Sequence, residues 1–460
     1  MKKLLSVVLA LAMLLSLFAG CGKNETGRNE DGKVVITVGG WPTEAGPSLD
    51  AMNETLEAFH KKYGDTIQVV PDTWTFSLDT FLVKAASGQL PTVYGTHLTE
   101  TERIINAGYA ADITNQVKKF GYEGKFNKNV EKLISRDGKY YMLPSSAYIM
   151  GMLANIDVLR KAGLVDENDN PIFPKTYEEL TEYSKIIKEK TGKAGFVMPT
   201  TGNNGGWHFT IIAWANGVDF MEKVDGKWKA TFNTPECVEV LQWIKDLKWK
   251  HNVLNANSLI DYTEALKLIA TGQAGYHLQS GAQNALMTYG MDKNDVAMGV
   301  IPAGKVKHVT LTGGSVQVIA NNATEEQKDA AFKWLEFTGV TPYATDDAKQ
   351  AIEKEYATNN AENYVVGVPK FSQWSDDAEI NQFRNEVIEK YTNVPKKNVS
   401  QYVMVDGLEI QPEEPVCCQD LYSTLDACIQ AVLTDKNADC KKLIANAAKD
   451  FQANFLNNAK

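Results

Sequence analysis

Apolar strand-like runs alternate with amphipathic segments over the first hundred residues. The β-branched run at residues 34–40 ends in two glycines and predicts a buried strand followed by a loop. Apolar residues at helical spacing predict a helix over residues 49–63, and the alternation continues with a strand at 66–70, a helix at 78–86 and a strand at 92–95. Alternating strands and helices favour parallel strand pairing with helices on both faces of the sheet. The pattern therefore predicts an α/β fold.

The rest of the chain carries further helix and strand signals. Residues 150–163 predict a strand that passes into a helix ending at a glycine. Thr176 and Thr324 are each followed three residues later by Glu or Gln, which is the sequence pattern of a capped helix start. Residues 295–304 and 313–321 predict strands late in the chain. No internal repeat is present, and there is no low-complexity tract apart from residues 22–32.

The N-terminus has the pattern of an export signal. Two lysines precede an uncharged, mostly apolar run at residues 4–19, which is too short for a comfortable membrane span. Small residues then precede Cys21, which predicts a signal peptide over residues 1–20 and cleavage just before the cysteine. Residues 22–32 have no apolar side chain larger than a methyl group, so we expect residues 21–32 to act as a flexible tether.

Length and charge limit the possible functions. A chain of 460 residues exceeds one usual hydrophobic core, so two domains are expected. The formal net charge is -10, and it becomes -12 once the two lysines of the predicted signal are removed. Phosphate binding needs clustered cations, so nucleic acid is not an expected partner.

The cysteines do not suggest a metal site. Besides Cys21, the chain has Cys237, Cys417, Cys418, Cys428 and Cys440, and no C-x-x-C pair or nearby histidine suggests zinc. Cys428 shares a helical apolar stripe with leucines and a valine, which favours core packing over a redox role. Cys417 or Cys418 could bond to Cys440, and the sequence leaves this pairing open.

Several segments, in order, resemble the extracellular solute-binding proteins of ABC importers, in particular the carbohydrate-binding group. The first is "LFAGC" at residues 17–21, which looks like a bacterial lipobox whose cysteine is lipidated. The others are "SGQLPTVYG", "INAGYAADIT", "DGKYYMLP", "NIDVLRKAGL" before "PKTYEEL", "TEALKLIATGQAGYHL", "GGSVQVIANNATEEQKDAAFKWLEF" and "AVLTDKNADCKKLIANAAKDF". Together they span about residues 33–455.

The resemblance implies a two-lobe periplasmic-binding-protein-like fold of type II, with a ligand cleft between lobes that closes by hinge motion. It implies an N-terminal lobe of residues 33–145 plus 300–340 and a C-terminal lobe of residues 146–299 plus 341–460, with chain crossings near 143–148 and 296–302. It also implies a monomeric lipoprotein on the extracellular face of the cell membrane, with permease subunits as partners. One acyl chain anchors a protein only marginally, so a cysteine carrying several chains is expected to hold it there.

Loops at the carboxyl ends of the predicted strands are rich in aromatic and polar residues, which suits a neutral, hydroxyl-rich ligand. Aromatic rings can cover the C–H faces of a sugar, while amides and carboxylates bond its hydroxyl groups. Trp214, Trp243 and Trp334 lie in helical apolar patterns and are assigned to the core, and Trp374 is a further candidate platform. The predicted ligand-binding residues are Trp41, Trp74 and Trp207 as stacking platforms and Glu44, His97, Glu100, Asn204 and Gln279 as hydroxyl partners.

Two alternatives remain beside a sugar receptor. The same fold could bind a polyamine, a peptide or another solute, since acidic residues occur in the same loops. A surface carbohydrate hydrolase would need two carboxylates at a set separation, and Glu44 and Glu100 are the first pair to test. No H-E-x-x-H or G-x-S-x-G motif occurs, so an enzyme is not expected, and neither is a cofactor or a metal.

Overall fold

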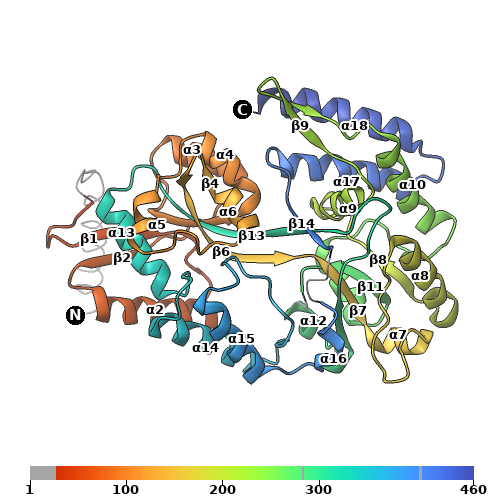
Figure 1. Ribbon diagram of the computed structural model, residues 1–460, viewed down its shortest axis with the longest axis horizontal. Coiled ribbons are helices and arrows are strands. Elements are labelled where there is room, and N and C mark those ends of the chain that lie inside the picture. The colour runs from red at the N-terminus through yellow and green to blue at the C-terminus, as the bar shows by residue number, and fades with distance from the viewer. Residues whose placement is uncertain (1–26, 282–283, 403–406, 460) are drawn as a thin grey trace, which may run out of the picture. The chain divides into compact units, whose positions relative to one another are not determined.

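The computed structural model describes residues 27–281, 284–402 and 407–459 (Figure 1). The chain divides into two compact units. Unit 1 comprises the chain up to Tyr94 together with Ile319–Trp334, and unit 2 comprises Gly95–Val318 together with Leu335–Lys460. The predicted signal peptide and the predicted lipidation site Cys21 lie outside the described residues, and the predicted lobe boundaries stay predictions. None of the described helices is both long and apolar enough to cross a membrane.

Unit 1 is built as the sequence pattern predicts. Its strands are β1 (Val34–Val38), β2 (Ile67–Pro71) and the first two residues of β3 (Val93–His97), and its helices are α2 (Pro47–Tyr63), α3 (Leu78–Ala86) and most of α13 (Glu325–Phe337). β1 pairs in parallel with both β2 and β3, because helices connect the three strands. Thr324 and Gln327 cap α13 reciprocally: each backbone N–H donates to the other's side-chain oxygen, at 3.0 and 3.2 Å.

The last part of the predicted tether differs from the expectation. Arg28 donates from its Nε to Glu326 at 2.8 Å, and the Asn29 amide donates to Gln68 at 2.8 Å. The Val35 backbone N–H donates to the Gly27 carbonyl at 2.9 Å. Polar contacts therefore hold residues 27–32 on unit 1, although this segment has no large apolar side chain to bury.

Unit 2 contains most of the chain. Its N-terminal part holds η1 (Leu98–Glu100), α4 (Thr101–Asn106), α5 (Thr114–Lys119), α6 (Lys128–Ile134), β4 (Ser135–Arg136), β5 (Lys139–Tyr140) and β6 (Met142–Ile149). Its middle part holds β7 (Gly151–Asn155), α7 (Ile156–Ala162), α8 (Tyr177–Thr191), β8 (Ala194–Val197), α9 (Asn204–Ala215), β9 (Met221–Val224), β10 (Lys227–Ala230), α10 (Pro235–Trp249), α11 (Tyr262–Ala270), β11 (Ala274–Gln279), α12 (Asn284–Thr288), η2 (Lys293–Asp295), β12 (Val296–Gly299) and β13 (Val309–Ile319). Its C-terminal part holds α14 (Asp346–Ala361), α15 (Glu379–Tyr391), α16 (Lys396–Val399), β14 (Glu409–Pro412), α17 (Cys418–Thr434), α18 (Cys440–Asn454) and η3 (Leu456–Asn458).

A mixed sheet lies at the centre of unit 2, with strand order β12-β7-β11-β8. β7 is antiparallel to β11 and β12, while β11 and β8 are parallel. All five residues of β7 are buried, and α17 packs against α9, α10 and α18 (Figure 1). In the same unit β13 runs antiparallel to β6 and parallel to β14. The sheet of unit 2 is therefore mixed, unlike the parallel pairing of unit 1.

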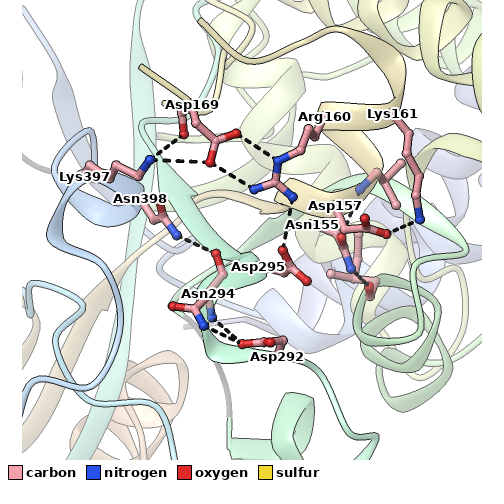
Figure 2. Close-up of polar contacts among 12 residues, drawn as sticks. Asn155, Asp157, Arg160, Lys161, Asp169, Asp292, Asn294, Asp295, Lys397 and Asn398 are labelled. Atoms are coloured by element: carbon pink, nitrogen blue, oxygen red, sulfur yellow. Dashed lines mark hydrogen bonds and ion pairs between the residues drawn. The ribbon is translucent and has the colours of Figure 1, made fainter. Parts of the chain in front are cut away.

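A polar network ties α16 to the loop after α7 (Figure 2). Lys397 on α16 donates to the backbone carbonyl of Asp169 at 3.0 Å, and Arg160 on α7 donates to the Asp169 carboxylate at 2.9 and 3.0 Å. The Asn398 amide donates to the Asn294 carbonyl at 2.8 Å. These bonds attach α16 to the loop after α7 and to the turn at Asn294.

The cysteines are thiols in the structure. All five described cysteines are free, so the disulfide considered between Cys417 or Cys418 and Cys440 is absent from the described part of the chain. Cys440 lies 3.4 Å from the side-chain oxygen of Gln242. Cys428 lies on α17 and is 4% exposed, which confirms the prediction that it packs in the core.

Candidate functional site

An arginine joins two acidic side chains at one end of unit 2. Glu100 ends η1, directly after β3, and its side chain is 4% exposed. The Arg103 guanidinium lies 3.6 Å from the Glu100 carboxylate and 3.5 Å from the carboxylate of Asp420 on α17. Burial raises the pKa of Glu100 and of Asp420, while the charge of Arg103 opposes both increases. The three residues form a charged cluster that brings η1 and α4 against α17.

A second acidic pair lies beside this cluster. The Tyr422 hydroxyl donates to half-buried Glu413 at 2.9 Å, and the Trp214 indole N–H donates to Glu414 at 3.0 Å. Burial raises the pKa of both glutamates to about 7. The charge of Glu100 also raises the pKa of Glu413. At neutral pH both glutamates can therefore be protonated and donate hydrogen bonds.

Trp207 lies on the N-terminal turn of α9, and hydrogen bonds from this turn to α17 fix its position. The Asp426 carboxylate accepts from the backbone N–H groups of Asn203 at 2.8 Å and Gly206 at 2.7 Å, so α17 supplies the cap of α9. Gly206 has no space for a side chain, because a Cβ there would lie 2.2 Å from the Tyr422 carbonyl oxygen. The Trp207 ring is half-buried and lies perpendicular to the ring of Tyr148 on β6, with centroids 6.2 Å apart.

Two cavities in unit 2 adjoin these residues. The larger has a volume of about 1200 Å³, and its lining includes Tyr148, Ser280, several amide side chains and the cations Lys128, Lys370 and Arg384. The smaller has a volume of about 460 Å³, and its lining includes Thr99, Glu413 and Glu414. None of the eight predicted ligand-binding residues lines either cavity, but Glu100, Trp207 and Gln279 are sequence or contact neighbours of residues that do.

The predicted residues of unit 2 lie in separate local settings. His97 is exposed at the end of β3, and Glu100 joins the charged cluster. Asn204 is half-buried at the start of α9, where its amide donates to the carbonyls of Thr201 and Gly202 at 3.0 and 2.9 Å. Gln279 is fully buried and receives the Ser280 backbone N–H at 2.7 Å. We expected Gln279 to face a ligand, but in this conformation its amide supports the end of β11.

The predicted residues of unit 1 differ in exposure. Trp41 is 5% exposed and stacks on Trp334 with ring centroids 6.2 Å apart, so in this conformation its ring belongs to the core of unit 1. Trp74 is half-buried, and its indole N–H donates to Thr80 at 3.3 Å. Glu44 is exposed between β1 and α2. The ligand roles of these three residues stay predictions.

Trp374 is not available as a stacking platform in this conformation. Its side chain is fully buried in unit 2, where it stacks on Phe126 with centroids 5.5 Å apart and meets Tyr122 edge-on at 5.7 Å. The sequence shows polar neighbours on both sides of Trp374, but the packing of these rings removes it from solvent. Our assignment of Trp374 as a candidate platform is therefore corrected to a core role.

Sequence reasoning missed much of the cluster. Arg103, Glu413 and Asp420 lie outside the aromatic and polar loops that predict the site, and Tyr148 lies in a predicted chain crossing. Asp420 and Tyr422 lie in the first turns of a helix that follows the acidic stretch "EEP". This stretch was the one sequence signal that could have indicated acidic site residues there. Among the described residues, no group of three or more His, Cys, Asp or Glu side chains could hold a metal ion.

The fold is that of the α/β periplasmic-binding-protein-like proteins. The crystal structure of the cyclic alpha-maltosyl-1,6-maltose binding protein from Arthrobacter globiformis matches it with a TM-score of 0.66 and 20% sequence identity, over 92% of this chain and 99% of that chain. The chain belongs to the bacterial extracellular solute-binding proteins, whose family model matches residues 54–350. This membership confirms the prediction of a solute-binding protein rather than an enzyme.

Two oligosaccharide-binding proteins of Bacillus subtilis are similar to this chain in sequence. The chain is 26% identical over 254 residues to an arabinooligosaccharide-binding protein of Bacillus subtilis (strain 168), covering 54% of this chain and 55% of that protein. It is 22% identical over 411 residues to the maltodextrin-binding protein MdxE of the same organism, covering 86% of this chain and 88% of that protein. The chain thus spans about half the length of the arabinooligosaccharide-binding relative that it matches.

Proposed function

We propose that this protein captures an oligosaccharide outside the cytoplasmic membrane and delivers it to the permease of an ABC transporter. The observation that carries the proposal is that α17 contacts both the Glu100–Arg103 pair, through Asp420, and the start of α9, through Asp426. The start of α9 carries Trp207, whose ring lies against Tyr148. The family membership, together with relatives named for arabinooligosaccharides and maltodextrin, supports a sugar as the solute.

The chemistry of this group suits a sugar. Trp207 and Tyr148 offer aromatic surface for the C–H face of a pyranose or furanose ring. Carboxylates accept hydrogen bonds from sugar hydroxyl groups, and the Arg103 guanidinium donates to their oxygens. Arg103 is held between Glu100 and Asp420, so its side chain loses little conformational entropy on binding.

Binding would then control delivery. A ligand that touches both predicted lobes favours the closed form, because only a difference in affinity between two conformations shifts their equilibrium. The permease would recognise the closed form, with ATP hydrolysis supplied by another subunit. We further propose that lipid on Cys21 anchors the protein at the extracellular face of the membrane, in keeping with the family's extracellular location.

The test is calorimetric titration of the mature chain with arabinooligosaccharides, maltodextrins, spermidine and a short peptide mixture, with chromatography of each mixture for products. Saturable binding of a saccharide with no product supports the proposal, and an affinity near 1 µM corresponds to about -8 kcal/mol. Saccharide turnover would identify a hydrolase, and binding of spermidine or peptide alone would overturn the sugar assignment.

A further inference from the structure

The hairpin β9–β10 presents one tryptophan in a fixed position. Asp225 and Gly226 form its two-residue turn, and both have positive φ, at 50° and 76°, which suits the right-handed twist of the hairpin. The hairpin register places Trp228 directly opposite Lys223. An isolated two-stranded hairpin is marginally stable, so its position depends on what it packs against.

A side chain of α18 holds this hairpin in place. The Gln452 side-chain oxygen accepts from the Ala230 backbone N–H at 2.8 Å, and its amide donates to the Trp228 carbonyl at 3.1 Å. Figure 1 shows β9 beside α18 at the C-terminal end of unit 2. The backbone that carries Trp228 is therefore fixed by a regular helix, as a binding residue requires.

The Trp228 ring lies at the wall of the 460 Å³ cavity. The side chain is half-buried, and the Lys223 ammonium lies 5.3 Å from its ring centroid, over one face. The indole N–H is buried and has no hydrogen-bond partner among the described residues. A cation over a partly exposed ring is held only weakly, so a ligand can displace the flexible lysine.

The lining of the same cavity also includes hydrogen-bonding groups. Arg136 on β4 donates to Glu102 on α4 at 3.1 Å, and both residues line the cavity together with Thr99 and Glu413. Thr99 adjoins Glu100, and Glu413 accepts from Tyr422, so this cavity adjoins the charged cluster. An aromatic ring together with charged and hydroxyl groups in one cavity lining is a combination that suits a sugar unit.

We propose that this cavity is an additional saccharide subsite, with Trp228 as its stacking platform and the Arg136–Glu102 pair as its hydroxyl partners. The subsite rests on the proposed function, and it makes the ligand an oligosaccharide whose chain extends from the charged cluster toward the hairpin. A disaccharide would occupy the charged cluster alone, while longer chains would also cover the Trp228 ring.

The test compares chain lengths in the mature protein. Wild type, Trp228→Ala and Trp228→Phe are titrated with arabinooligosaccharides and maltooligosaccharides of two to six units. We expect wild-type affinity to rise with length, Trp228→Ala to lose about tenfold or more for the longest chains, and Trp228→Phe to retain part of this gain. Disaccharide affinity should stay within twofold in all three proteins. Lys223→Ala should keep or improve long-chain affinity, because the ring face is uncovered.

A matched control is Trp249→Ala. Trp249 lies on α10, is 43% exposed and donates to the Val432 carbonyl at 2.8 Å, outside the lining of the cavity. Its removal should leave every affinity unchanged. The subsite would be overturned if wild type and Trp228→Ala bound long chains equally well, or if Trp228→Ala lost the same affinity for every chain length. Neither result would contradict the proposed function as a sugar receptor. A wild type that binds no saccharide would overturn the proposed function and the subsite with it.

Discussion

The guanidinium of Arg103 lies 3.5 Å from the carboxylate of Asp420, a residue 317 positions further along the chain. The same guanidinium lies 3.6 Å from Glu100. One cation thus balances two acidic groups that burial would otherwise neutralise, and it links the segment after β3 to the helix that also caps α9.

Removal of this cation should destabilise the protein. In Arg103→Gln two partly buried carboxylates remain near one another, so we expect a loss of about 1–3 kcal/mol in the free energy of unfolding at pH 7. The loss should shrink at pH 5, because both carboxyl groups then take up protons more readily. Urea denaturation at the two pH values measures this, with Lys185→Gln as the control. Lys185 pairs with Glu182 at the surface, where removal should cost under about 1 kcal/mol. Equal stability of wild type and Arg103→Gln would contradict the prediction.

Trp207→Ala should weaken saccharide binding by about tenfold or more, because the ring offers the largest aromatic surface next to Tyr148. Trp207→Tyr keeps an aromatic ring and should lose less. Calorimetry gives the affinities, and thermal unfolding checks that both variants are folded. If Trp207→Ala bound saccharide with unchanged affinity, Trp207 would not be a ligand-binding residue.

The stability of the protein should depend on Glu414 as the pH changes. Burial raises its pKa from 4.5 to about 7, so the folded state keeps a proton that the unfolded state releases between these values. The resulting stabilisation is complete below about pH 4.5 and is lost as the pH rises through about 7. Glu414→Gln keeps an oxygen for the Trp214 indole but does not titrate. Relative to wild type, it should gain on the order of 2 kcal/mol between pH 5 and pH 8.

Denaturant titrations of both proteins across this pH range measure the difference. Parallel stability curves for wild type and Glu414→Gln would show that Glu414 does not take up a proton in the folded state at pH 5 to 7.

Gly206→Ala should be strongly destabilising. The new Cβ would lie 2.2 Å from the Tyr422 carbonyl oxygen and 2.5 Å from its Cα, so α9 and α17 would have to separate. We expect a loss of about 2 kcal/mol or more. Gly226→Ala is the control, because a Cβ there meets nothing within 4 Å and only the positive φ adds about 1 kcal/mol. A smaller loss for Gly206→Ala than for Gly226→Ala would show that the α9–α17 contact yields easily.

Cys21→Ala should release the protein from the membrane, since the proposed lipid would have no attachment point. Fractionation of cells that express the full-length chain measures this. Cys237→Ala, at a fully buried core cysteine, should stay with the membrane fraction. A Cys21→Ala protein that remains in that fraction would contradict the anchor.

The local elements were predictable because their signals are local. The strand expected at residues 34–40 is β1, and the helix expected at 49–63 is α2. Thr176 accepts the Glu179 backbone N–H at 3.2 Å, as the capping pattern predicts. Hydrophobic periodicity and helix-cap residues are patterns within a few positions of the chain, so a single sequence is enough to locate helices and strands.

The candidate site was only partly predictable. Glu100 and Trp207 follow strand ends and were found by their position in polar, aromatic loops. Arg103 and Asp420 were not, because their meaning depends on a contact between distant segments. Trp41 and Gln279 have the right chemistry for a ligand, yet neighbouring elements cover them in this conformation. Exposure is a property of packing that residue type alone does not specify.

The sequence by itself determined the α/β class, the order of most strands and helices, their caps and the solute-binding resemblance. The tertiary structure alone decided that Arg103 bridges Glu100 and Asp420, that α17 caps α9 through Asp426, and that Trp228 faces a cavity near the charged cluster. The physical reason is the difference in sequence separation between the interactions involved. Propensity and periodicity act over one or two turns, whereas charge pairing, burial and cavity shape arise from segments that only the folded chain brings together.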